Sequence, residues 1–369
     1  MRRGARLAAL LAVTARLGAA DPAWEAAQWA DPALVQVQNE ELAFRRFVHP
    51  ATSTESFFMV ARYNGGHVLI FDLFDLDSPL VSRWGIYVLV TDPLGHRYWT
   101  THLFDRSRVR TDPGRLGFSD GASTVDGDGS SWRISLRLEG FACDLLVRNE
   151  LPAWRGGDGV DELTADGRMY ERRLLPCPLG EVTGWLSAGG PAVEVNGQAL
   201  LERTTRVTPI SRMHQCLYSL RAWSDPWAPD RLFFEMLEMT SHASYGGKRI
   251  PRLGVATPEG WLFTTRDYTL EPVEFTQAEA APYPAPSILR ISARDRGYVL
   301  SAEYRTETLF DVTDIITEVP LILRPIVAAF FTRPVYLRFL GVLTGTLTRP
   351  DGTPVSFELR GPFEYVLPR

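Results

Sequence analysis

Short apolar runs separated by glycine-rich turns recur along most of this 369-residue chain. Residues 56–62 and 67–76 are apolar and aromatic, and the sequence Asn-Gly-Gly at 64–66 joins them. A turn of this composition between two apolar runs is the strongest local signal of a β-hairpin. The pattern therefore predicts antiparallel strands from residue 56 onward.

Strict alternation in residues 131–138 supports the same interpretation. Trp132 and Ile134 fall on one face of an extended chain, and Arg133 and Ser135 fall on the other. A period of two is typical of a strand that is buried on one face only. Similar segments follow at 181–187, 192–202, 215–223, 231–240, 248–256 and 261–270. Many short strands at regular spacing predict an all-β barrel or sandwich.

Residues 152–169 interrupt this pattern. They include the polar, glycine-rich sequence Trp-Arg-Gly-Gly-Asp-Gly and show no apolar period. A chain of this length also exceeds what a single barrel needs. We therefore expect a first domain at 51–170 and a second at 171–369, preceded by an N-terminal extension at 21–50.

Residues 314–340 are strongly apolar but contain three prolines and three arginines. These residues exclude a membrane span, because proline breaks the helix and arginine is costly in lipid. The preferred interpretation is a short helix packed against a barrel before the closing hairpin at 342–366. A patch that contacts a membrane surface is the alternative.

The first residues have the composition of a secretory signal. Arginines at positions 2, 3 and 6 precede a short apolar run at 7–15, and small residues follow up to Ala20. This pattern predicts a signal peptide at 1–20 and a secreted, periplasmic or envelope-side protein. The apolar run is too short to span a bilayer. A cytoplasmic amphipathic helix is the alternative.

Composition narrows the possible functions. The net charge is −5 and no basic stripe occurs, so nucleic acid is not an expected partner. The nucleophile elbow, the phosphate-binding loop and the dinucleotide fingerprint are all missing, and we expect no cofactor. Cys143, Cys177 and Cys216 are too few for a disulfide framework. They form either one bridge or none.

Candidate metal ligands are equally sparse. His214 and Cys216 would share one face of a strand, but no third ligand pairs with them by spacing. The Asp-Gly-Asp-Gly sequence at 126–129 resembles the start of a calcium loop, yet the position of the bidentate glutamate holds Arg137. We therefore expect no metal site.

A few polar residues within aromatic strands mark the candidate ligand site. Glu202 ends one apolar run, and Tyr218, Arg221 and Trp223 lie on a following strand. On a regular strand Arg221 and Trp223 share one face, and Tyr218 lies on the other. We expect Arg221 and Trp223 to point into an apolar cavity of the second barrel, with Arg221 paired to Glu202.

Glu202 is also the main candidate for a catalytic acid. An arginine partner would keep its carboxyl ionised, which argues against that role in the resting protein. The alternative is a solvated Glu202 with Arg221 as its surface partner. Trp84, Tyr87 and Tyr245 complete the predicted set of ligand-binding residues.

Several segments, taken in order along the chain, resemble one protein family. They are Thr54–Met59, Trp84–Tyr87, Phe118–Asp120, Ser123–Gly127, Ser131-Trp132, Asp144-Leu145, Pro152–Trp154, Pro178–Gly184, Gly189-Gly190, Val195–Ala199 and Tyr336–Gly341. Their order resembles the hydroxyneurosporene synthase (carotenoid hydratase) group, with the related AttH-type, survival-factor and Diels–Alderase-like proteins. The resemblance covers most of the chain after about residue 50. It implies two consecutive lipocalin-like antiparallel barrels.

One segment departs from that family. After Val195-Asn196-Gly197 the hydratases tend to show a Tyr/His-Asp-His and Trp-Gly pattern, whereas this chain has Leu200–Thr205 without histidine. Only Glu202 could replace the acidic residue, so the resemblance supports the predicted architecture more strongly than it supports hydratase activity. We expect binding of an apolar lipid, isoprenoid or polyketide-like molecule. The alternative is a hydratase or cyclase acting on such a molecule, and a purely structural role remains if both barrels are filled by their own side chains.

Overall fold

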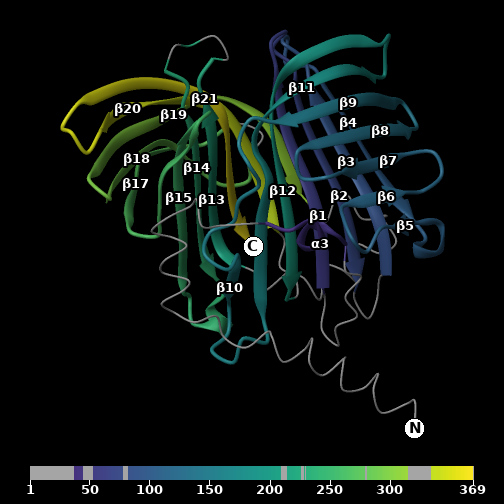
Figure 1. The fold of residues 1–369 in the computed structure, drawn as a ribbon, viewed down its shortest axis with the longest axis horizontal. Helices are drawn as coiled ribbons and strands as arrows, with labels where there is room; N and C mark the ends of the chain where they lie inside the picture. The colour runs from purple at the N-terminus through teal and green to yellow at the C-terminus, as the bar shows by residue number, and fades with distance from the viewer. Residues whose placement is uncertain are drawn as a thin grey trace.

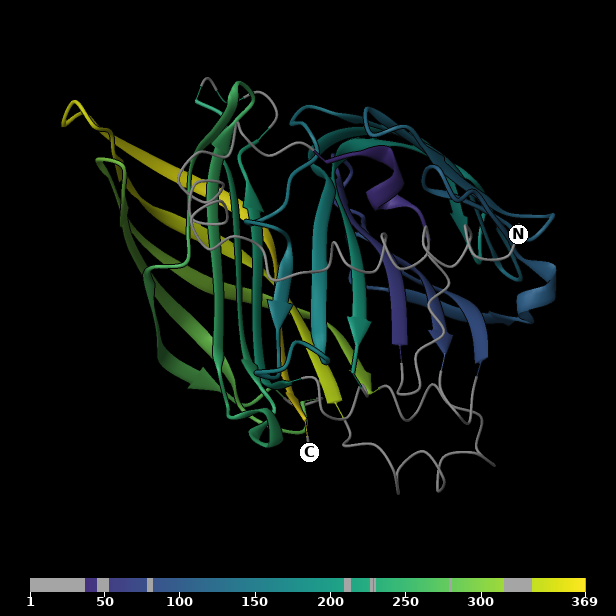
Figure 2. The same ribbon diagram turned by 60° about the horizontal axis from the view of Figure 1, so that its bottom comes forward.

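The structure is a computed structural model that describes residues 37–44, 53–77, 82–208, 214–225, 228, 230–278, 281–314 and 334–368. Nearly all regular structure in these ranges is antiparallel sheet, arranged as two curved sheets side by side (Figures 1 and 2). The prediction of an all-β protein of two lipocalin-like units is confirmed. The expected signal peptide and residues 315–333 of the expected helical segment lie outside the described residues. The described end of that segment, from Pro334 onward, is a strand and not a helix. Within the described ranges, no helix has the length and apolar character required to cross a membrane.

The first sheet follows the spatial order β4-β3-β2-β1-β12-β11-β9-β8-β7-β6-β5, with β10 paired to β11. Its strands are β1 (Ser53–Tyr63), β2 (Val68–Asp77), β3 (Ser82–Thr91), β4 (Arg97–Phe104), β5 (Arg110–Thr111), β6 (Gly117–Ser119), β7 (Thr124–Gly127), β8 (Ser131–Leu138), β9 (Phe141–Asn149), β10 (Val160–Glu162), β11 (Tyr170–Ala188) and β12 (Val193–Val207). One helical turn, α3 (Asn39–Leu42), precedes them, and the 3-10 turn η2 (Arg106–Arg108) follows β4.

The second sheet follows the order β16-β15-β14-β13-β21-β20-β19-β18-β17. Its strands are β13 (His214–Trp223), β14 (Phe233–Ser241), β15 (Arg249–Thr257), β16 (Gly260–Thr265), β17 (Tyr268–Thr276), β18 (Ala285–Asp295), β19 (Tyr298–Asp314), β20 (Pro334–Thr348) and β21 (Pro354–Pro368). The 3-10 turn η4 (Ala243–Tyr245) joins β14 to β15. The C-terminal strand β21 lies in the middle of this sheet, between β13 and β20.

The sheets divide the chain between Val207 and His214, not after residue 170 as the sequence pattern had suggested. β12 pairs with β1 along the whole of β1, from Ser53 opposite Val207 to Tyr63 opposite Gly197. β11 and β12 therefore belong to the first sheet. The glycine-rich stretch at 152–169 lies between two strands of that sheet, so it does not separate the two units.

Each sheet encloses an apolar core of its own side chains. Phe57, Trp84 and Trp132 are fully buried in the first core, and Phe263 and Phe363 are fully buried in the second. Cys143 and Cys177 lie in the first core as free thiols, and Cys216 is also unpaired. The described structure thus contains no disulfide.

A third apolar cluster joins the two sheets. Val60 and Leu89 enter it from the first sheet, Trp223 and Phe233 from the second, and Trp154 from the connection after β9. Strand alternation explains the arrangement, because residues that flank a core residue along a strand point to the opposite face. The sheets therefore pack through the faces that do not line their own cores, and this contact forms the candidate site.

Candidate functional site

Four side chains form a row across the first sheet, on the face that meets the second sheet. Tyr87 of β3 is opposite Asp72 of β2, Asp72 is opposite Phe58 of β1, and Phe58 is opposite Glu202 of β12. Because cross-strand partners share a face, the row brings two carboxyls and two aromatic rings together. Burial by the opposing sheet makes this face unlike the solvated outer face of a simple barrel.

Glu202 is the charged centre of this face. Its Oε2 atom accepts hydrogen bonds from Arg173 Nη2 at 2.5 Å and from Arg221 Nη2 at 2.6 Å. Burial alone would raise the pKa of Glu202, but the charges of Arg173, Arg221 and Arg206 outweigh it and lower the pKa to about 2. Glu202 is therefore ionised at neutral pH, which removes it as a resting proton donor.

The predicted pairing of Arg221 with Glu202 is confirmed, and so is the shared face of Arg221 and Trp223. That face, however, looks toward the first sheet and not into the second barrel. Leu220 and Ala222 point into the core of the second sheet, so alternation turns Arg221 and Trp223 away from it. Arg221 lies over the ring of Phe58, 5.4 Å from its centroid.

The structure separates the other predicted residues. Trp84 lies in the core of the first sheet, 4.7 Å from the ring of Phe44. Tyr218 faces the core of the second sheet beside Tyr365. Tyr245 lies in η4, where its hydroxyl is 2.9 Å from Thr208 Oγ1. Of the predicted aromatic residues, Tyr87 and Trp223 belong to the apolar cluster between the sheets that includes Phe58, whereas Tyr245 packs in a separate small cluster with Leu163.

Asp72 was missed at the sequence level. Its Oδ1 atom accepts a hydrogen bond of 2.7 Å from Ser56 Oγ, and burial outweighs this bond and raises the pKa of Asp72 to about 6. The Asp72 side chain is surrounded by protein atoms, but the residue is only half-buried and keeps some contact with solvent. Tyr336 and Arg338 of the second sheet are close enough to act on it electrostatically. The signal in the sequence that could have identified Asp72 is its position inside the apolar run 67–76.

Asp311 forms a second charged link between the sheets. It is almost fully buried and accepts hydrogen bonds from Arg97 of the first sheet and from Arg338 of the second, the latter at 2.5 Å. Thr313 Oγ1 donates to the same carboxylate at 2.6 Å and lies 3.3 Å from the hydroxyl of Tyr87. Tyr87 is thereby tied to the second sheet.

A third link uses Asp161 of β10. Its two oxygens accept hydrogen bonds from Arg252 and Arg266 of the second sheet. Each of the three carboxylates thus binds two guanidinium groups, with at least one from the opposite sheet. Such pairs favour one fit of the two surfaces, because breaking a pair would leave a buried carboxylate with one guanidinium fewer.

His214 lies at the start of β13. It is fully buried, and burial lowers its pKa to about 4, so the imidazole is neutral. An irregularity in the pairing of β13 between His214 and Cys216 breaks the shared face expected from the sequence. In the part of the chain that the structure describes, no three histidine, cysteine, aspartate or glutamate side chains cluster as metal ligands.

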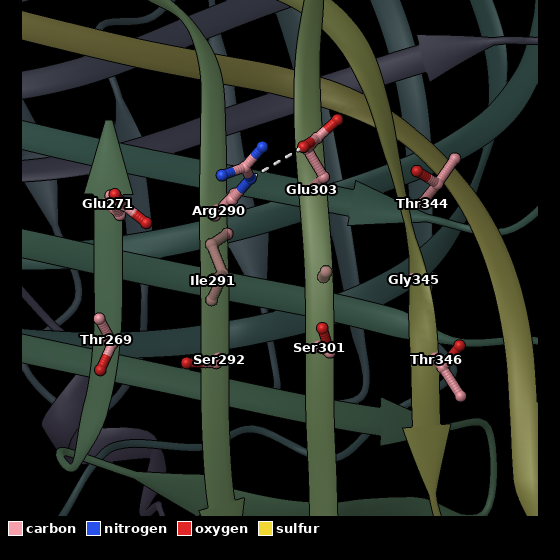
Figure 3. A pocket seen from close by; sticks show the side chains of 11 residues that line it. Thr269, Glu271, Arg290, Ile291, Ser292, Ser301, Glu303, Thr344, Gly345 and Thr346 are labelled. Atoms are coloured by element: carbon pink, nitrogen blue, oxygen red, sulfur yellow. Dashed lines mark hydrogen bonds and ion pairs between the residues drawn. The ribbon is translucent and has the colours of Figure 1, made fainter. Parts of the chain in front are cut away.

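The outer face of the second sheet carries a shallow polar groove of about 580 Å³ across β17, β18, β19 and β20 (Figure 3). Hydroxyl and charged side chains line it, including Thr269, Ser301 and Thr346, and Arg290 Nε donates to Glu303 Oε2 at 3.2 Å. The groove is open to solvent, and hydroxyl and charged groups line much of it, so it encloses an apolar molecule poorly.

No family model matches the sequence, and no curated protein matches it. Solved structures do match the fold. CghA has 13% identity and a TM-score of 0.65, over 90% of this chain and 93% of that chain. A putative AttH from Nitrosomonas europaea has 15% identity and a TM-score of 0.62, over 90% and 96%. Kievitone hydratase from Nectria haematococca has 9% identity and a TM-score of 0.55, over 89% and 97%. The chain therefore shares its lipocalin-like fold of two antiparallel β-units with these three proteins.

Proposed function

We propose that the protein binds an apolar small molecule between the two sheets, against Phe58, Asp72 and Tyr87. The observation that carries this proposal is Asp72, a carboxyl set between two aromatic side chains and still in contact with solvent. Ligand sites combine apolar walls with a few polar groups that orient the ligand. The interiors of the two units are filled by their own large side chains, and Asp72 lies outside both cores.

The structural neighbours support a small molecule as the ligand. One CghA structure was solved with Sch210972, and another neighbour is a kievitone hydratase. We extend these observations to this chain on the strength of the shared fold and the aromatic contact face. We infer a ligand of the lipid, isoprenoid or polyketide class, since apolar burial of about 25 cal/mol per Å² supplies affinity without many hydrogen bonds.

A hydratase is the second candidate, and the different environments of Asp72 and Glu202 favour it. Two carboxyls whose pKa values are pushed apart, to about 6 and about 2, are typical of acid–base sites. Asp72 would donate its proton to one carbon of an alkene, and water would add to the other carbon. The water would then release a proton that restores Asp72. Asp72 thus replaces Glu202 as the proposed acid.

Titration with the neutral dye N-phenyl-naphthylamine tests the binding site. The fluorescence of the dye should rise on binding, and Phe58→Ala should weaken its affinity about tenfold, since the substitution removes much of the apolar wall. Phe275→Ala is the matched control, because Phe275 is an exposed phenylalanine of β17 in the second sheet. Equal affinities of the wild type and Phe58→Ala would refute the proposed site.

A further inference from the structure

Exposed apolar side chains gather on the hairpin formed by β3 and β4. Of the five large apolar residues that are exposed in the described structure, three lie on this hairpin. They are Leu94 in the turn, 80% exposed, and Trp99 and Leu103 on β4, 52% and 48% exposed. Single exposed apolar residues are common on protein surfaces, but a local concentration marks an interaction site.

The two β4 residues lie on the same face of the first sheet as the proposed ligand site. Trp99 is opposite Leu89, and Leu103 is opposite Gly85, on either side of Tyr87. Gly85 leaves space for the ring of Phe74. A Cβ atom at position 85 would lie 2.2 Å from the nearest atom of that ring. β4 is one of the two edge strands of the sheet. An apolar surface therefore continues from the contact between the sheets to an exposed edge.

Arginines pair with the acidic groups near the end of the hairpin that holds Leu103. Asp105 pairs with Arg83 at 2.8 Å, and Asp75 pairs with Arg106 at 2.7 Å, while Asp92, in the turn beside Leu94, pairs with His96 at 2.9 Å. Arg108 and Arg110 follow β4 in the chain, at the end of η2 and in β5, are exposed, and have no ionic partner among the described residues. Exposed tryptophan and leucine, followed in the chain by unpaired arginines, are suited to a lipid surface with anionic headgroups.

We propose that the hairpin of β3 and β4 docks on an anionic lipid surface, so that an apolar ligand passes from the bilayer to the site between the sheets. Only the passage of the ligand to the site between the sheets rests on the proposed function, whereas the docking on lipid does not. Trp99 and Leu103 would enter the headgroup region, and Arg108 and Arg110 would contact the phosphates. A second copy of the chain is a poorer occupant. Three side chains bury far less than the roughly 1,200 Å² that a specific protein interface needs.

Sedimentation of the full chain with vesicles tests the docking. The wild type should sediment with vesicles of phosphatidylcholine mixed with phosphatidylserine, and less with phosphatidylcholine alone. The double variant Trp99→Ser with Leu103→Ser should bind at least about tenfold more weakly, because it loses most of the exposed apolar area. Arg108→Glu with Arg110→Glu should remove the preference for phosphatidylserine. Phe275→Ser, which removes an equally exposed ring from the second sheet, should bind as the wild type does.

Several results would overturn the docking surface. They are a wild type that does not bind vesicles, an equal loss in Phe275→Ser, and a dimer that dissociates in the Trp99 and Leu103 variant on size-exclusion chromatography. Dye titration without vesicles separates this proposal from the proposed function. The Trp99 and Leu103 variant should bind the dye with unchanged affinity. If the wild type binds vesicles but not the dye, docking stands and the ligand site fails.

Discussion

Glu202 on the first sheet and Arg221 on the second are joined by a hydrogen bond of 2.6 Å between Oε2 and Nη2, and both side chains are at least nine-tenths buried. The bond crosses the contact between the two units. A guanidinium presents its donors in one rigid plane and can serve two acceptors in that plane. A lysine ammonium does not have this planar geometry. Only one lysine, Lys248, occurs in the chain. Arginine is thus the residue that makes these buried links possible.

Replacing Arg221 by methionine should destabilise the protein by about 3 kcal/mol, because Glu202 would remain buried with Arg173 as its nearest partner. Urea denaturation followed by circular dichroism measures this loss. Arg290→Met, which breaks an exposed ion pair with Glu303, should cost less than about 1 kcal/mol. Similar losses in the two variants would show that the buried pair has no special role.

Asp72 predicts an unusual dependence of stability on pH. Its pKa is about 6 in the folded protein against a reference of 3.8. Folding therefore favours the protonated form, and the associated stability is fully present below the reference pKa and is lost as pH rises through about 6. Asp72→Asn should stabilise the protein near pH 7 by about 1–2 kcal/mol, after discounting for solvent contact.

Denaturation curves at several pH values between about 4 and 7 check this sign. The difference in stability between Asp72→Asn and the wild type should widen as pH rises. Asp128 supplies the matched control, because this turn carboxyl has a pKa lowered to about 2 by hydrogen bonds from Ser130 and Ser131. Asp128→Asn should change stability in the opposite direction. An Asp72→Asn protein that is less stable at neutral pH would contradict the environment described for Asp72.

Trp223→Ala should destabilise the protein by about 3–5 kcal/mol, as expected for a large aromatic residue removed from a packed interior. Trp223 is fully buried between the sheets, and the guanidinium of Arg62 lies 5.5 Å from the centroid of its ring. Thermal unfolding measures the loss. Trp99→Ala, at an exposed tryptophan, should leave the midpoint nearly unchanged. A stable Trp223→Ala protein would show that the sheets pack without this ring.

The alternation of β13 could be predicted from the sequence, and it placed Arg221 beside Trp223 correctly. Alternation states which residues share a face, but it does not state which face lines a core. That depends on the pairing of β13 with β21 at the far end of the chain. The division of the sheets depends likewise on β12 pairing with β1, which are separated by ten other strands in sequence order. Nonlocal pairing of this kind leaves no local pattern.

The polar residues of the site divide in the same way. Asp72 could have been identified, since a carboxyl within an apolar strand must be either paired or functional. Arg173 could not, because β11 begins at Tyr170, well before the segment 181–187 that the pattern predicted as a strand. Asp311 could not, because its partner Arg97 belongs to the other sheet. The sequence pattern therefore indicated the kind of site, an arginine-paired carboxylate among aromatic rings, but not its place between the sheets.

If the chain hydrates an alkene, Asp72 must be protonated when the reaction starts. Its pKa of about 6 predicts that the rate rises as pH falls through this value, with a plateau below it. Asp72→Asn should lower the rate by about a hundredfold or more, because an amide cannot donate the proton, while dye binding stays within about twofold.

The measurement is product formation from an acyclic isoprenoid alkene in deuterium oxide, where one deuterium should appear on carbon. The matched control is Asp311→Asn, at one of the carboxylates that link the sheets, which should change stability and leave the pH profile of the rate unaltered. A rate that rises with pH, or an Asp72→Asn protein of full activity, would exclude Asp72 as the acid and leave binding as the function of the site.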